Sequence, residues 1–143
     1  MIVGLGLDVC DIDRMRKNLE RYGLAFMDKV LTAEERAYCE RRRDPAVPFA
    51  GRFAAKEATI KALGAPDGLR WTDMVVLPAE GAPPRIALRR VGIDAAHALG
   101  ATRALLTITH DGGVAAAVVI LEAVPGEPLL LGYPEEAHPE DRE

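Results

Sequence analysis

Several signatures of common protein classes are missing from this 143-residue sequence. No apolar run approaches the roughly 20 residues that a membrane-spanning helix needs, and the first residues lack the basic region of a secretory signal peptide. The two cysteines, Cys10 and Cys39, form neither a disulfide framework nor a zinc-binding spacing. We therefore expect a single soluble domain in the reducing cytoplasm.

Familiar catalytic loops and a strong positive charge are missing as well. The sequence has no Gly-x-x-x-x-Gly-Lys-Ser/Thr loop, no Gly-x-Ser-x-Gly elbow and no metalloprotease histidine pair. The formal net charge of -4 arises at the end of the chain, because residues 122–143 hold seven acidic side chains and one arginine. Residues 1–121 hold 17 basic and 15 acidic side chains, so the body is only mildly basic. We expect no nucleic-acid partner.

Residues 2–10 alternate in the manner of a β-strand. One face is apolar and consists of Val3, Leu5, Leu7 and Val9. The other face carries Gly4, Gly6 and Asp8, and two glycines in a strand indicate that another backbone or a ligand comes close. Asp8 could simply close the strand, but Asp11 and Asp13 are better placed to cap the next helix. Asp8 is therefore a candidate functional residue.

Residues 12–22 are predicted to form an amphipathic helix. Its polar side carries three cations at positions i, i+3 and i+7, namely Arg14, Lys17 and Arg21. Such a stripe is often only a solvated surface. The alternative is a docking surface for an acidic partner, where complementary charge speeds encounter and fixes orientation. The residues alone leave both interpretations open.

The longest helix is predicted to have Pro48 in its first turn and to end before Gly64. Four apolar side chains share one stripe that should face a core: Phe49, Phe53, Ile60 and Leu63. Lys56 lies within this stripe, where an unpaired ammonium would be costly. Glu57 and Lys61 lie one turn apart on its flank, a spacing that usually marks a solvated ion pair. The alternative is a rigid platform for phosphate and metal chemistry.

The remaining segments predict further short elements. Thr32 and Glu35 form a capping-box signature that opens a helix to about Arg43. Strands are expected over residues 74–77, 85–90, 104–109 and 114–121, and a helix over 93–99. Asp111-Gly112 between the last two runs predicts a tight hairpin. His110 lies beside this turn, a position where a lone histidine is more often structural than functional.

Residues 124–143 differ in composition from the 1–123 body. They contain four prolines, many acidic residues and one short apolar island at Leu129–Leu131. This composition predicts a poorly ordered tail.

Two carboxylates and several cations remain as candidates for chemistry. Asp8 and Glu57 come from separate elements, and two carboxylates are the usual protein share of a Mg²⁺ site that substrate phosphates complete. Arg52, Lys56 and Lys61 could neutralise charge on a transferring phosphoryl group and its leaving group. These residues favour Mg²⁺-dependent phosphoryl chemistry.

Four segments together resemble a known family. They are Gly-Leu-Gly-Leu-Asp-Val at 4–9, Arg-Phe-Ala-Ala-Lys-Glu-Ala-x-x-Lys-Ala-Leu-Gly at 52–64, Gly-x-Pro at 81–83 and Thr-His at 109–110. Each piece is weak, but their joint order is specific to the holo-acyl-carrier-protein synthases, the small bacterial 4′-phosphopantetheinyl transferases. Thr109 stands where many relatives have serine, which keeps the hydroxyl. The resemblance runs from residue 2 to about 123, so the tail lies outside it.

The resemblance implies an α+β fold in which a twisted antiparallel sheet packs against a long central helix. It implies transfer of the 4′-phosphopantetheine group from coenzyme A to a serine of apo acyl carrier protein, releasing adenosine 3′,5′-bisphosphate. Asp8 and Glu57 would hold Mg²⁺ on the coenzyme A pyrophosphate, and Lys61 would stabilise or protonate the leaving phosphate. The serine proton would pass to Glu57 or to a water that Glu57 orients.

The resemblance also assigns the binding residues. Arg52, Lys56 and His110 would lie around the coenzyme phosphates, with the turn at Gly81–Pro83 near the adenine. The stripe of Arg14, Lys17 and Arg21 matches the family's basic helix, which meets an acidic helix of the carrier. The family forms homotrimers with sites between subunits.

Two alternatives remain. The chain could be a non-catalytic carrier- or coenzyme A-binding module of the same fold, although a binding module has little need of Asp8, Glu57 and Lys61 together. It could also be an enzyme that hydrolyses a nucleotide pyrophosphate with Mg²⁺.

Overall fold

The order of helices and strands confirms the predicted α+β class, with small shifts at their ends. A computed structural model describes residues 1–134. Its elements are β1 (Ile2–Asp11), α1 (Ile12–Tyr22), α2 (Leu24–Val30), α3 (Ala33–Glu40), α4 (Ala46–Leu63), η1 (Trp71–Asp73), β2 (Met74–Leu77), β3 (Arg85–Leu88), α5 (Val91–Ala98), β4 (Arg103–Asp111) and β5 (Val114–Glu122). Among the described residues, no helix has the length and apolar character needed to cross a membrane.

The strands form two antiparallel sheets rather than one. The larger sheet has the order β1-β5-β4, and β2 pairs with β3 in a separate hairpin. The turn between β4 and β5 has Gly112 and Gly113 at φ values of 59° and 81°. A two-residue turn with positive φ at both positions is what a tight hairpin requires, which confirms the predicted connection.

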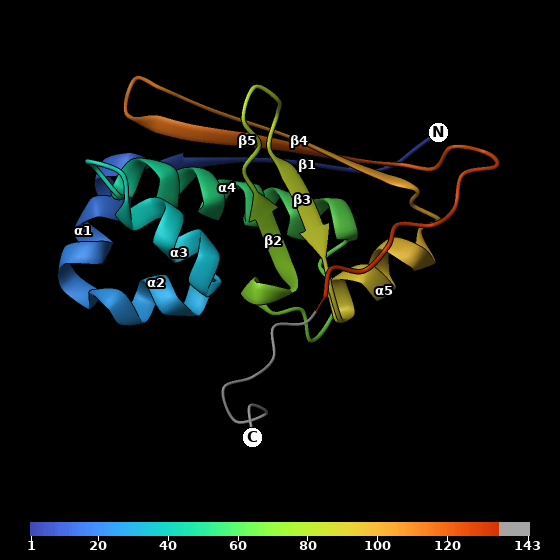
Figure 1. Ribbon diagram of the computed structural model, residues 1–143, viewed down its shortest axis with the longest axis horizontal. Coiled ribbons are helices and arrows are strands. Elements are labelled where there is room, and N and C mark those ends of the chain that lie inside the picture. The colour runs from blue at the N-terminus through green and yellow to red at the C-terminus, as the bar shows by residue number, and fades with distance from the viewer. Residues whose placement is uncertain (135–143) are drawn as a thin grey trace.

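Helix α4 lies directly against one face of the larger sheet (Figure 1). A Cβ atom added to Gly6 would lie 1.7 Å from the carbonyl oxygen of Ala58, and one added to Gly4 would lie 2.4 Å from that of Ala62. No side chain fits between strand and helix at these positions. The predicted close approach is confirmed, and a helix backbone makes it.

The apolar face of β1 points away from α4 and is largely exposed. Leu5, Leu7 and Val9 are 63%, 56% and 59% exposed, and Leu105 on β4 is 51% exposed. The glycine face of β1 is therefore the one that packs on α4, while Leu5, Leu7 and Val9 lie on the outer surface of the sheet.

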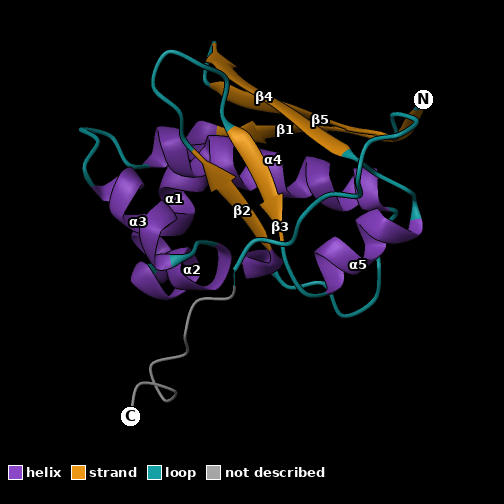
Figure 2. Ribbon diagram, turned by 45° about the vertical axis from the view of Figure 1, so that its right-hand side comes forward, coloured by secondary structure: helices purple, strands orange, loops and turns teal. Residues whose placement is uncertain are grey.

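The other elements cover the rest of α4. Helices α1, α2 and α3 gather near its beginning and α5 lies toward its other end (Figure 2). The predicted apolar stripe is confirmed, because Phe49 and Leu63 are buried and Phe53 stacks on Trp71 with ring centroids 5.3 Å apart. The helix ends at Gly64, which adopts the left-handed conformation expected of a C-terminal glycine.

The segment after β5 packs against the body as far as Pro134, so the prediction of a poorly ordered tail is wrong for residues 124–134. The Leu130 amide donates to the Ala101 carbonyl at 3.1 Å, and the Tyr133 amide donates to the Leu88 carbonyl at 2.8 Å. Leu130 is half-buried against the core. Proline content did not prevent docking because neighbouring carbonyls accept the free amide groups. The rest of the predicted tail, 135–143, lies outside the described residues.

Candidate active site

Asp8, Glu57 and Lys61 come together where β1 crosses α4. Asp8 lies on the inner face of β1, and Glu57 and Lys61 lie one turn apart on α4. The Lys61 ammonium is 3.3 Å from Asp8 Oδ1 and donates to the Leu7 carbonyl at 2.9 Å. The structure therefore joins the three residues predicted to be catalytic, and the glycines of β1 permit this approach.

The two carboxylates repel each other and are only partly neutralised. Burial raises the pKa of Glu57, the charge of Asp8 raises it further, and Lys61 lowers it. Two adjacent carboxylates beside one exposed ammonium offer hard oxygen ligands to a cation, and the residues present fit Mg²⁺.

Cys10 lies near this site but is not a nucleophile. Burial raises its pKa to about 11, and the charges of Asp8, Asp11 and Glu57 oppose ionisation while Arg14 favours it. A thiol of this pKa is protonated at neutral pH, so it lacks the thiolate that attacks substrates.

A pocket of about 360 Å³ brings together Arg52 and His110, two of the predicted coenzyme-binding residues. The Arg52 guanidinium stacks 4.0 Å above the Tyr38 ring. Its buried Nε has no hydrogen-bond partner among the described residues. A buried guanidinium N–H without an acceptor is costly. Independently of that atom, the side chains of Arg42, Arg52 and His110 line the pocket, and guanidinium groups suit an anionic ligand.

The pocket lies at the same end of the sheet as Asp8. His110 on β4 pairs with Ala115 on β5, and Ala115 pairs with Cys10 on β1. Asp8 is two residues along the same strand, a distance of about 7 Å at the usual rise of a strand. Two strand spacings of about 4.8 Å also separate His110 from β1, so the pocket and the carboxylates lie at the same end of the sheet, roughly 12 Å apart.

Sequence reasoning missed two pocket residues, Tyr38 and Arg42. Both line the pocket, and the Arg42 guanidinium lies 4.5 Å from the Tyr38 ring. The basic run 41–43 is visible in the sequence, but at the end of a helix it is explained equally well by the helix dipole. The aromatic partner of Arg52 is 14 positions away in sequence, and no local pattern indicates it.

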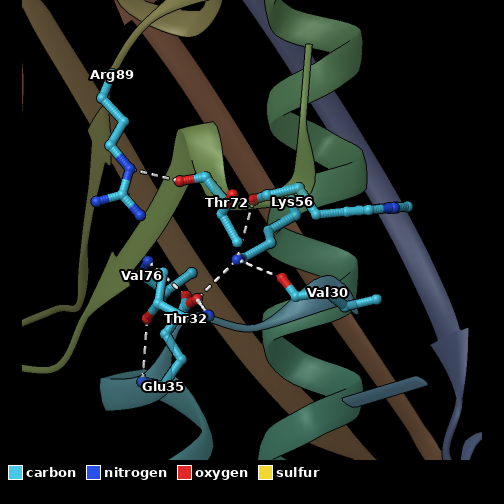
Figure 3. Close-up of polar contacts among 8 residues, drawn as sticks. Val30, Thr32, Glu35, Lys56, Thr72, Val76 and Arg89 are labelled. Atoms are coloured by element: carbon cyan, nitrogen blue, oxygen red, sulfur yellow. Dashed lines mark hydrogen bonds and ion pairs between the residues drawn. The ribbon is translucent and has the colours of Figure 1, made fainter. Parts of the chain in front are cut away.

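Lys56 is not part of this site, which corrects the prediction that it contacts a coenzyme phosphate. Its side chain is fully buried, and its ammonium is 2.7 Å from Glu35 Oε1, 2.7 Å from the Val30 carbonyl and 3.1 Å from the Trp71 carbonyl (Figure 3). All three ammonium hydrogens therefore have protein acceptors. Burial lowers the pKa of Lys56, while Glu35 acts in the opposite direction.

The Gly81–Pro83 turn lies in the exposed connection between β2 and β3. Residues 78–80 of this connection line a separate hollow together with Tyr38 and Arg42. Since those two residues also line the Arg52 pocket, the connection lies beside that pocket.

The predicted cationic stripe lies along the exposed side of α1. Arg14, Lys17 and Arg21 are exposed, and none forms an ion pair with another described residue. Arg16 on the same helix differs, because it pairs with Asp13 and Asp44. The stripe is therefore free to meet an external partner.

Comparisons with known proteins identify the family. The 4′-phosphopantetheinyl transferase superfamily matches residues 4–118. A holo-[acyl-carrier-protein] synthase of Anaeromyxobacter dehalogenans is 51% identical over 125 residues, covering 85% of this chain and 97% of that protein. The corresponding synthase of Myxococcus xanthus is 48% identical over 123 residues, covering 85% and 96%.

Solved structures give the same result. The Helicobacter pylori holo-[acyl-carrier-protein] synthase in complex with coenzyme A has a TM-score of 0.71 and 29% identity, covering 82% of this chain and 99% of that one. The synthase of Neisseria meningitidis has a TM-score of 0.73 and 26% identity, covering 85% and 99%. The chain therefore belongs to the 4′-phosphopantetheinyl transferase superfamily.

Proposed function

We propose that this protein is a holo-[acyl-carrier-protein] synthase. It transfers 4′-phosphopantetheine from coenzyme A to a serine of apo acyl carrier protein and releases adenosine 3′,5′-bisphosphate. The observation that carries the proposal is the meeting of Asp8, Glu57 and Lys61 beside an anion-binding pocket, in a chain about half identical to named synthases.

Asp8 and Glu57 are the residues that would hold Mg²⁺. When bound, Mg²⁺ supplies positive charge that neutralises the pyrophosphate of coenzyme A and the charge developing on it. The mutual repulsion of the two carboxylates supports this role, because a cation between them relieves it.

The reaction needs one proton removed and one negative charge stabilised. The serine oxygen attacks the phosphorus that carries the pantetheine arm, and the bond from that phosphorus to the oxygen of adenosine bisphosphate breaks. Glu57 accepts the serine proton, directly or through a water that it orients. Lys61 is half-exposed and already reaches the Asp8 carboxylate, so it can stabilise or protonate the departing phosphate.

Coenzyme A recognition uses the neighbouring pocket. Arg52 and His110 would bind coenzyme phosphates, and the connection that contains Pro83 would lie near the adenine. The presence of both residues in the lining of one pocket supports the first assignment, because a guanidinium pairs favourably with phosphate oxygens.

The carrier would dock on α1. Arg14, Lys17 and Arg21 present three exposed cations, none of which forms an ion pair with another described residue. This arrangement suits an acidic protein surface, since opposite charges steer and orient the encounter.

Homotrimer formation would bury the outer face of the larger sheet. Leu5, Leu7 and Leu105 are each more than half exposed on it, and contiguous apolar surface of this kind marks interaction sites. A trimer with sites between subunits would also enlarge the coenzyme A site beyond what one short chain provides. We place the enzyme in the cytoplasm, in fatty acid biosynthesis.

Mass spectrometry of several apo carrier proteins tests the proposal. Incubation with coenzyme A, Mg²⁺ and this protein should add one phosphopantetheine to the carrier. Omitting Mg²⁺ or adding EDTA should abolish the gain. Absence of the added mass with every carrier would refute the activity, and formation of adenosine bisphosphate without it would indicate hydrolysis instead.

A further inference from the structure

The buried ion pair of Lys56 and Glu35 joins several elements around α4. Lys56 contacts the end of α2 through Val30, α3 through Glu35 and η1 through Trp71. Glu35 extends the cluster, because its Oε1 accepts from the Thr32 amide at 2.8 Å and its Oε2 accepts from the Val76 amide of β2 at 2.9 Å (Figure 3). Lys56 and Glu35 together thus link α4 to α2, α3, η1 and β2.

This cluster is an uncommon way to gain stability. Charges that leave water lose hydration, and apolar residues of similar volume often replace a buried ion pair without loss of stability. An ion pair has a property that an apolar contact lacks, since its hydrogen bonds are directional and allow one orientation of the helix.

Lys56 and the catalytic residues occupy different sides of the same helix. At about 100° per residue, Glu57 and Lys61 project about 100° and 140° from Lys56. Ala58 and Ala62, which touch the glycines of β1, project about 200° and 240° from it. The Lys56 cluster and the glycine contact therefore hold opposite sides of α4, and Glu57 and Lys61 lie between them.

We propose that Glu35 and Lys56 are positioning residues, which fix the rotation of α4 so that Glu57 and Lys61 face Asp8. The glycine contact alone sets the distance between helix and strand but leaves the helix free to roll along it. A roll of roughly 15° would move a side-chain end by about 1.5 Å, given a helix radius of about 5–6 Å. Displacements of about 1 Å in an active site can lower rates about 100-fold.

The inference rests on the proposed metal site and is tested on the full chain with three variants. Lys56→Met removes the ammonium, and Glu35→Gln/Lys56→Met removes the ion pair while retaining volume. Asp73→Asn is the matched control, because Asp73 is equally buried and its hydrogen bonds go to Arg70 and Arg90, neither of which lies on α4. Each variant is assayed for folded fraction, kcat, carrier KM and binding of Mn²⁺ in the presence of coenzyme A, by electron paramagnetic resonance.

Positioning predicts a folded double variant whose kcat falls about 10- to 100-fold. Its Mn²⁺ affinity should fall with kcat, while its carrier KM stays within about twofold because α1 carries the docking stripe. Asp73→Asn should keep wild-type kcat and Mn²⁺ affinity even if it is less stable.

Four results would overturn the inference. They are a folded double variant with wild-type kcat, a fall in kcat without a fall in Mn²⁺ affinity, equal losses in Asp73→Asn, and failure of both Lys56 variants to fold. Asp8→Asn separates the two proposals: if it binds Mn²⁺ like the wild type, the metal assignment fails whatever Lys56 does.

Discussion

Helix α4 takes part in two ionic clusters with similar residue types but different burial. Lys56 and Glu35 form a closed, buried cluster, and Lys61, Glu57 and Asp8 form an open, partly exposed one. Around Lys56 the charges are almost fully buried, the ammonium has three acceptors, and each oxygen of its carboxylate partner accepts at least one hydrogen bond. Around Lys61 the ammonium is 55% exposed, and Glu57 on α4 is repelled by a like charge, Asp8 on β1. A lysine followed by glutamate along the chain thus places one charge in the core and the next in the active site.

The difference shows what each cluster can do. A satisfied, buried pair has no capacity left for a ligand, so it can only hold structure. A half-exposed cluster with excess negative charge retains affinity for a cation and for the phosphates that accompany it. In this helix, the charged groups that can bind a ligand are therefore those whose charge is not fully compensated by protein partners.

Neutralising a carboxylate of the open cluster should have the largest effect. Glu57→Gln and Asp8→Asn should each lower kcat about 10²- to 10⁴-fold, because each removes a proposed metal ligand or proton acceptor. Their free energies of unfolding should stay within about 1 kcal/mol of the wild type, since both sites are partly solvated. Carrier modification and chemical denaturation measure the two effects, and normal turnover by either variant would contradict the metal assignment.

A change in the closed cluster should instead lower the stability of the fold. Glu35→Ala leaves the Lys56 ammonium buried without its carboxylate, so it should lower the free energy of unfolding by about 3–5 kcal/mol. Urea denaturation measures the loss. A loss smaller than about 1 kcal/mol would mean that water or another group replaces Glu35, so that the cluster is open to solvent.

The exposed cations of α1 are also without ion-pair partners among the described residues. Arg14→Glu/Arg21→Glu should raise the carrier KM about tenfold or more and leave the KM for coenzyme A unchanged, because repulsion slows the encounter. Arg70→Glu/Arg85→Glu reverses two exposed cations elsewhere and serves as the matched control. Equal carrier kinetics in both double variants would reduce the stripe to solvated surface.

The smallest expected effect is the pH dependence of stability that Glu57 causes. The folded protein raises the pKa of Glu57, so Glu57 ionises more easily in the unfolded chain. Wild-type stability should therefore fall as pH rises from the ordinary glutamate pKa through the folded one, whereas Glu57→Gln lacks this loss. In EDTA, the free energy of unfolding of Glu57→Gln relative to that of the wild type should rise between pH 4 and pH 8, by less than about 1 kcal/mol. A difference that falls as pH rises would contradict the raised pKa of Glu57.

Local patterns predicted the elements and part of the site. Alternation identified β1, helical periodicity identified α1 and α4, and Asp111-Gly112 identified the hairpin, because each signal is contained in a few neighbouring residues. Gly4 and Gly6 predicted a close neighbour correctly, since removal of side chains has few other structural uses in a strand.

Long-range pairings could not be predicted. The partner of Lys56 is 21 residues earlier in the chain, so the sequence revealed that its charge was costly but not how the cost was met. The acidic tail was misjudged for residues 124–134 because composition does not report the acceptors that the body offers. Whether an apolar strand face lies inside or outside is likewise decided by the whole assembly.

The glycine contact between β1 and α4 has a consequence for how this protein can change over evolution. The separation of the β1 and α4 backbones is set by the radii of backbone atoms, which are the same for every amino acid. Most core side chains elsewhere can therefore grow or shrink without altering this backbone separation, while Glu35 and Lys56 set the rotation of the helix. Positions 4 and 6 are the exceptions, where a single methyl group would act as a wedge between the two halves of the site.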